Sequence, residues 1–107
     1  MDHTAFFNAF TEVLDKRVAG NPKIPNELRE RLGQLKKNIG LMWPEGEELL
    51  DAIEAADPQA TVLCRYVVDN KTFCRAFTPE MCSGVRGAPV ASCAGFDSNW
   101  SAINWTA

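Results

Sequence analysis

The chain has 107 residues, enough for one domain, and a domain of this size buries only roughly 60% of the surface that its unfolded chain exposes. Hydrophobic residues make up 46% of it, but no apolar run approaches the roughly 20 residues that a membrane-spanning helix needs. The net charge is −3, and neither half carries the surplus of lysine and arginine that neutralises phosphates, so we expect no membrane span and no nucleic-acid partner.

Three amphipathic helices are predicted in the first half of the chain, residues 1–58. They cover about residues 4–19, 25–40 and 44–57, each with an apolar stripe at spacings of three and four. Glycines follow the first two helices, and Pro58 ends the third, because the residue before a proline resists the helical conformation. The short links between them favour antiparallel packing.

The second half, residues 59–107, begins with a predicted β-hairpin. Residues 61–68 and 72–77 are dense in β-branched and aromatic side chains, which are typical of strands. The segment Asp69-Asn70-Lys71 between them is a turn signal. The length of the loop is open, and it decides whether the two cysteines of the hairpin share a face of the sheet.

After the hairpin, a helix of about one turn and an irregular tail are predicted. Thr78-Pro79-Glu80 has the form of a helix start, and Gly84 stops that helix. From residue 85 onward, glycine, proline and serine interrupt any periodicity. We expect the tail to fold back, because two tryptophans near its end are costly to expose. The predicted fold class is α+β, with residues 1–107 forming a single small domain.

The four cysteines all lie in the second half, which has the least regular apolar pattern and so the greatest need of cross-links. We therefore predict two disulfides. Strand geometry disfavours a bond between the two hairpin cysteines, so two pairings stay open. They are Cys64–Cys82 with Cys74–Cys93, and Cys64–Cys93 with Cys74–Cys82. Disulfides favour secretion or another oxidising compartment, although the amino terminus shows no export signal.

An alternative use of these cysteines is an intracellular zinc module. Structural zinc sites usually take their thiolates in pairs two to four residues apart, whereas Cys64, Cys74, Cys82 and Cys93 are more widely spaced. Catalysis by a cysteine nucleophile would need a base, and His3 is the one histidine of the chain. We therefore predict no catalytic residue, no cofactor and, outside this alternative, no metal.

The predicted function is non-catalytic: a small binding or effector-like module that contacts another protein. The candidate anchors for such a partner are five aromatic residues of the hairpin and the tail: Tyr66, Phe73, Phe77, Trp100 and Trp105. Core packing is the commoner role of such side chains. A second alternative is a precursor peptide, with residues 1–58 as a helical leader and residues 59–107 as a modified core rich in cysteine, serine and threonine. The oligomeric state is not predicted.

Overall fold

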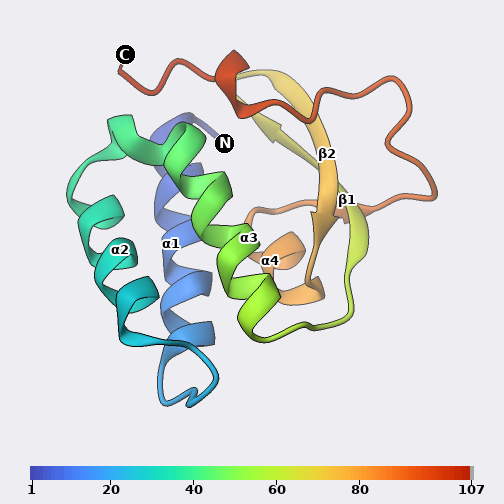
Figure 1. The fold of residues 1–107 in the computed structure, drawn as a ribbon. Helices are drawn as coiled ribbons and strands as arrows, with labels where there is room; N and C mark the ends of the chain where they lie inside the picture. Colours follow the sequence, from blue (N-terminus) through green and yellow to red (C-terminus); the bar gives the residue numbers. More distant parts are fainter. Residues whose placement is uncertain (107) are drawn as a thin grey trace.

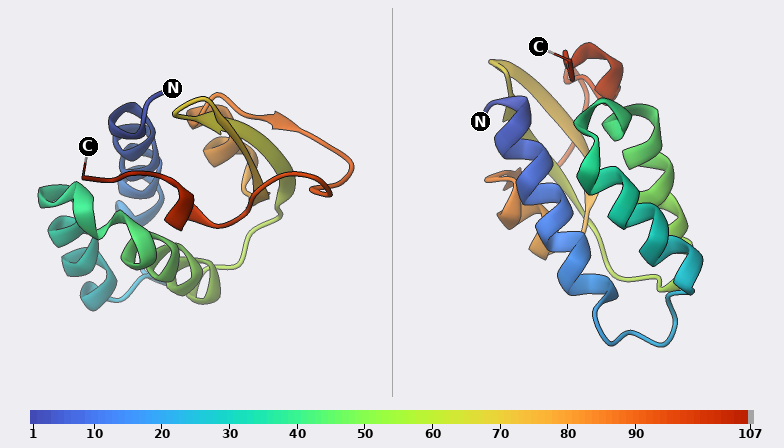
Figure 2. Two further views of the ribbon diagram at one scale, coloured as in Figure 1. Left: turned by 90° about the horizontal axis from the view of Figure 1, so that it is seen from above. Right: turned by 90° about the vertical axis from the view of Figure 1, so that its left-hand side faces the viewer.

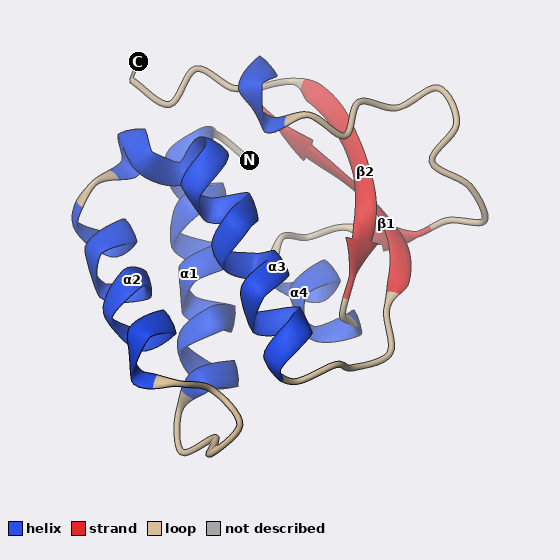
Figure 3. Cartoon of the chain, in the orientation of Figure 1, coloured by secondary structure: helices blue, strands red, loops and turns tan. Residues whose placement is uncertain are grey.

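The protein has the α+β architecture that the sequence predicts, seen in a computed structural model that describes residues 1–106 (Figure 1). Within these residues, four α-helices accompany a small antiparallel sheet with the strand order β2-β1-β3 (Figure 3). The helices are α1 (His3–Val18), α2 (Asn26–Lys37), α3 (Glu47–Ala56) and α4 (Pro79–Gly84), and the strands are β1 (Val62–Val68), β2 (Lys71–Phe77) and β3 (Ala88–Pro89).

The three predicted N-terminal helices are all present, with differences at two ends. Helix α2 ends at Lys37 rather than at Gly40, because Asn38 takes an extended conformation and its side chain accepts the Gly40 N–H at 3.0 Å. Helix α3 begins at Glu47 rather than at Pro44. Trp43 precedes that proline and has extended backbone angles, as such residues prefer, so the segment before α3 is an irregular turn.

A polar network joins the C-terminal end of α1 and the link that follows it to the C-terminal end of α3. The Arg17 guanidinium pairs with Glu54 of α3 and donates to the Asp57 carbonyl oxygen at 2.8 Å. The Asn21 carboxamide donates to the Asp57 carboxylate at 2.8 Å. This hydrogen bond, followed by the positive charge of Lys23, lowers the pKa of Asp57. The links between the helices are therefore fixed by specific contacts.

The hairpin turn has two residues, Asp69 and Asn70, because Val68 lies opposite Lys71. Both turn residues have positive φ angles, 50° and 65°, as the tightest hairpin turn requires, and Asp and Asn tolerate this conformation better than most residues. Asp69 also binds α1, since its carboxylate accepts the backbone N–H of His3 and contacts the ring Nδ1, each at 3.0 Å. The turn thereby anchors the start of the chain.

The two-residue turn decides which side chains face the helices. Cys64, Tyr66 and Val68 of β1 are buried and form the inner face of the hairpin, which packs against the helices. The alternate residues of the hairpin form the other face, which we call the outer face. It consists of Leu63, Arg65 and Val67 in β1 and of the residues opposite them in β2, which are Ala76, Cys74 and Thr72. Cys64 and Cys74 thus point to opposite sides of the sheet.

The C-terminal tail folds back around the hairpin, as predicted. It pairs first with β1 through β3, then swings away from the sheet, and then returns along the free edge of β2, where the Cys74 N–H donates to the Asp97 carbonyl oxygen at 2.9 Å (Figure 2). A short helical turn, Trp100–Ala102, follows and carries Trp100 into the core. Trp100 and Trp105 are thereby sheltered from water.

One hydrophobic core contains residues from both halves of the chain. At its centre the ring of Phe6 stacks on Tyr66, with centroids 5.5 Å apart, and meets Trp100 edge-on at 5.4 Å. Arg75 lies at the border of this core, paired with Glu47 at 2.8 Å and placed 5.0 Å from the centre of the Trp100 ring. Helix α1, the hairpin and the tail therefore stabilise one another.

Gly87 gives a test of how tightly the hairpin packs on α4. A Cβ atom at this position would overlap the Cys64 sulfur and lie 2.9 Å from the Arg65 carbonyl oxygen. We expect Gly87→Ala to lower the free energy of unfolding by about 1–3 kcal/mol. In α2, by contrast, a Cβ at Gly33 meets nothing within 4 Å, so Gly33→Ala should raise it by up to about 1 kcal/mol. Urea unfolding of both variants checks this, and equal effects would contradict it.

Candidate protein-interaction surface

The five aromatic residues predicted as partner anchors are core residues in the structure. Each is at most 6% exposed: Tyr66, Phe73, Phe77, Trp100 and Trp105. They lie on the inner face of the hairpin or on the tail where it packs inward, and a buried ring offers no surface to a partner. The alternative interpretation, core packing, is the one that their positions support.

The polar ends of these aromatic side chains are satisfied inside the protein. The Trp100 indole N–H donates to the Tyr66 hydroxyl at 2.7 Å, and the Trp105 indole N–H donates to the Trp100 carbonyl oxygen at 3.3 Å. Burial raises the pKa of Tyr66, so this hydroxyl stays protonated in the folded protein. Because these groups are paired within the fold, they are not poised to bind a partner.

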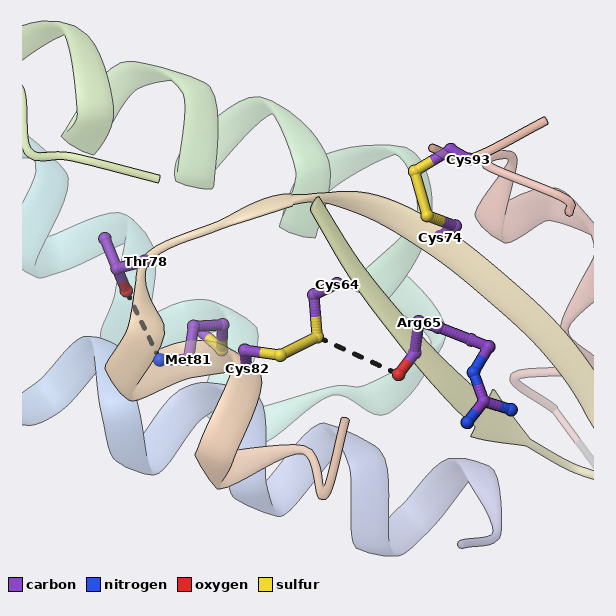
Figure 4. Close-up of a disulfide and its surroundings, with 7 residues drawn as sticks. All are labelled: Cys64, Arg65, Cys74, Thr78, Met81, Cys82 and Cys93. Atoms are coloured by element: carbon purple, nitrogen blue, oxygen red, sulfur yellow. Dashed lines mark hydrogen bonds between the residues drawn. A yellow bond between two sulfur atoms is a disulfide. The ribbon is translucent and has the colours of Figure 1, made fainter. Parts of the chain in front are cut away.

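The four cysteines form the two disulfides Cys64–Cys82 and Cys74–Cys93, which is one of the two predicted pairings (Figure 4). The first joins the inner face of β1 to α4, and the second joins the outer face of β2 to the tail. No free cysteine is present in the described part of the chain. The disulfides give the alternative zinc site no support, because bonded sulfurs are not the thiolates that zinc requires.

The catalytic pair considered from the sequence, a cysteine nucleophile with His3 as its base, lacks a free thiol in residues 1–106. His3, the candidate base, is held by Asp69 and lies near Trp105, at 6.3 Å between ring centroids, and every cysteine is bonded. These residues also contain no group of three or more histidine, cysteine, aspartate or glutamate side chains placed to hold a metal ion. In the described residues, no free cysteine is therefore available as a nucleophile for His3 to activate.

The exposed apolar side chains mark three other places on the surface: the link between α2 and α3, the outer face of the hairpin, and the tail. Within residues 1–106 five large hydrophobic side chains are more than a third exposed: Leu41, Trp43, Leu63, Val67 and Phe96. The first two sit in the link between α2 and α3. Leu63 and Val67 lie on the outer face of the hairpin, 37% and 39% exposed, on either side of Arg65, and Phe96 lies on the tail between Cys93 and Asp97.

The outer face is held rigidly. Its two strands are paired over seven residues each, the Cys74–Cys93 disulfide fixes the tail to it, and the Val90 N–H donates to the Leu63 carbonyl oxygen at 2.8 Å. Arg65 has no acidic partner among the described residues. The outer face therefore presents exposed aliphatic groups and an unpaired guanidinium on a fixed scaffold, with little flexibility to lose when a partner binds.

A groove between α1 and α4 has a volume of about 920 Å³. Its walls mix charges of both signs, including Glu12, Lys16 and Glu80, with small residues such as Ala9 and Gly84. It contains none of the five exposed large hydrophobic side chains. The outer face is the stronger candidate for an interaction surface.

The sequence did contain a signal for the outer face. Once Cys64 and Tyr66 are assigned to the core, the period of two in a strand places Leu63, Arg65 and Val67 on the opposite side. The run from residue 61 to 68 is nearly all apolar, however, and hides this alternation. No comparable sequence pattern indicated the short turn after α4. The position of Phe96 on the tail could not be predicted from a pattern either.

No protein-family model, no curated protein and no solved structure matches this chain. None of the helices within residues 1–106 has both the length and the apolar character needed to cross a membrane. The two disulfides are compatible with an oxidising or extracellular compartment.

Proposed function

We propose that this chain is a non-catalytic binding protein that recognises another protein through the outer face of its hairpin. The observation that carries the proposal is the exposure of Leu63 and Val67 beside the unpaired Arg65 on a disulfide-fixed sheet. Protein interfaces combine an apolar centre with arginine, which contributes both packing and hydrogen bonds. A rigid surface also loses little conformational entropy on binding, so more of the contact energy appears as affinity.

The compartment proposed for this activity is an oxidising one, reached by secretion. Two disulfides in so small a domain support this proposal, because small extracellular domains rely on such cross-links to supplement a limited core. An effector-like role also fits the disulfides. A protein that works outside its cell must keep its fold without chaperones, and covalent cross-links help it to do so. An intact mass four hydrogens below the free-thiol formula, in protein from its native source, would support it; unpaired thiols there would contradict it.

The precursor alternative has less support. The Phe6 ring stacks on Tyr66, and Phe10 packs edge-on against Trp100 at 5.2 Å, so the proposed leader and the proposed core share one interior. Cleavage of the chain near residue 58 would separate the two sides of this core and expose large aromatic surfaces on both. We favour a function of the intact chain.

A photocrosslinking experiment tests the proposed surface. We expect benzoylphenylalanine at position 63, irradiated in an extract or secretion from the producing organism or its host, to give a discrete protein adduct. The same group at Lys37, an exposed position on α2, is the matched control and should not give that adduct. Adding Val67→Asp should reduce the yield at least tenfold while changing the free energy of unfolding by less than about 0.5 kcal/mol. Identical adducts at both positions, or none, would contradict the proposal.

A further inference from the structure

Two arginines stand out because almost every other cation of the protein has a partner. In residues 1–106, lysines and arginines pair with carboxylates or, for Arg29, with backbone carbonyl oxygens. Arg65, Arg86 and Lys37 are the exceptions in this part of the chain. Lys37 lies on α2, at the end of a helix, whereas Arg65 and Arg86 lie together.

Arg65 and Arg86 line the same small pocket, beside the short pairing of β1 with β3. The pocket has a volume of about 110 Å³, and its other walls are Met1, Tyr66, Val67, Val85 and Ala88. None of these described lining residues is acidic. In a protein with a net charge of −3, two arginines thus line a cavity whose walls supply no acidic partner, and Figure 4 shows the Arg65 side chain extending away from both disulfides.

The backbone conformation at Arg86 is unfavourable for an arginine. Its φ angle is 58°, in the left-handed region where glycine is unstrained and a long side chain is disfavoured. The turn holds Arg86 there, because its N–H donates to the Ser83 carbonyl oxygen at 3.0 Å and the Gly87 N–H donates to that of Cys82 at 2.8 Å. For the turn alone, glycine at position 86 would serve better than arginine.

We propose that Arg65 and Arg86 form a clamp for a carboxylate of the protein partner. This inference rests on the proposed function and deepens it by naming the chemistry of the partner: an acidic side chain next to apolar residues that pack on Leu63 and Val67. Guanidinium groups bind carboxylates through paired, charge-assisted hydrogen bonds. A pocket of about 110 Å³ accommodates one such group.

A protein carboxylate is favoured over the phosphates of a nucleic acid. Nucleic-acid binding draws its affinity from many cations spread along a surface, whereas this pocket has two and the residues beside it are aliphatic. An acidic residue flanked by apolar ones matches both the charge and the apolar surroundings. The partner segment is therefore acidic and amphipathic.

Titration with a defined peptide, followed by amide chemical shifts, tests the clamp. The probe is an acetylated, amidated Glu-Leu-Glu peptide, and Gln-Leu-Gln is its neutral control. We expect saturable shifts at residues 65–67 and 85–87 with the acidic peptide only. Arg65→Gln combined with Arg86→Gln should weaken binding at least tenfold, and Lys37→Gln should leave it unchanged. Shifts of equal size from both peptides, or none, would overturn the proposal.

Two further measurements separate the possible failures. Arg86→Gly should weaken peptide binding, and the thermal unfolding midpoint of this variant should be no lower than that of the wild type. A lower midpoint with unchanged binding would assign Arg86 a structural role and overturn the clamp. A short single-stranded DNA that binds more tightly than the acidic peptide would also overturn it. If the adduct at position 63 forms but the acidic peptide does not bind, the clamp fails and the proposed function stands; if the adduct is absent, the proposed function itself fails.

Discussion

Replacing Trp100 with alanine is expected to lower the free energy of unfolding by about 3–5 kcal/mol, a large part of the stability of a domain this small. Trp100 is fully buried and contacts Phe6 and Phe10 edge-on, so its removal leaves a cavity where the helices, hairpin and tail meet. The buried Tyr66 hydroxyl would also lose its donor. We expect a measurable fraction of this variant to be unfolded at room temperature.

The matched control is Trp43→Ala, which removes the same side chain from a site that is 40% exposed. We expect it to cost less than half as much as Trp100→Ala in urea unfolding followed by far-ultraviolet circular dichroism. Trp100→Phe should fall between the two, since phenylalanine fills part of the space but cannot donate to Tyr66. Equal losses at positions 100 and 43 would show that the tail is not a structural part of the core.

The periodicity of the sequence predicts the helices and the hairpin well, because local physics specifies them. Asp2 caps α1 by accepting the Ala5 N–H at 2.7 Å, and Thr78 caps α4 by accepting the Met81 N–H at 3.3 Å. The ends that differ from the prediction, at Asn38 and Trp43, depend on how the link between α2 and α3 packs. Such tertiary contacts override the preferences of single residues.

The disulfide pairing could be narrowed to two possibilities but not chosen from the sequence. The choice depends on the path of the tail, which places Cys93 beside Cys74 on the outer face, and on α4, which places Cys82 beneath Cys64. Neither placement follows from a short-range pattern. The same reason explains why aromatic anchors were predicted on residues such as Trp100: composition shows that large rings are present, but only the assembled fold shows which are covered.

The candidate surface was harder still to predict. Leu63 and Val67 belong to an apolar run in which inner and outer positions look alike, and Arg86 is assigned only by the turn after α4. The exposure of an aliphatic residue is a property of the whole fold, because it depends on whether any other segment of the chain packs on that residue. A single sequence contains the alternation of a strand but not the side that the core occupies.

Removal of the Cys64–Cys82 disulfide, by Cys64→Ala with Cys82→Ala, is expected to be the most damaging change. The sequence separations of the two disulfides are 18 and 19, so restriction of the unfolded chain contributes about 3 kcal/mol in each case. The two bonds differ in their surroundings, however. Cys64 and Cys82 lie in the core with Gly87 packed against both sulfurs, whereas Cys93 is only partly buried.

Replacing Cys64 and Cys82 with alanine therefore leaves a void in the core and also removes a restraint on the unfolded chain. We expect it to lower the free energy of unfolding by roughly 1–2 kcal/mol more than Cys74→Ala with Cys93→Ala does. The outer pair also has support that survives its loss, since the Asp97 hydrogen bond and the buried Trp100 still hold the tail to β2. Urea unfolding of the two double variants, each with its remaining disulfide verified by mass, measures the difference. Equal losses would mean that loop entropy alone decides, and a larger loss for the outer pair would mean that the tail depends on its covalent bond.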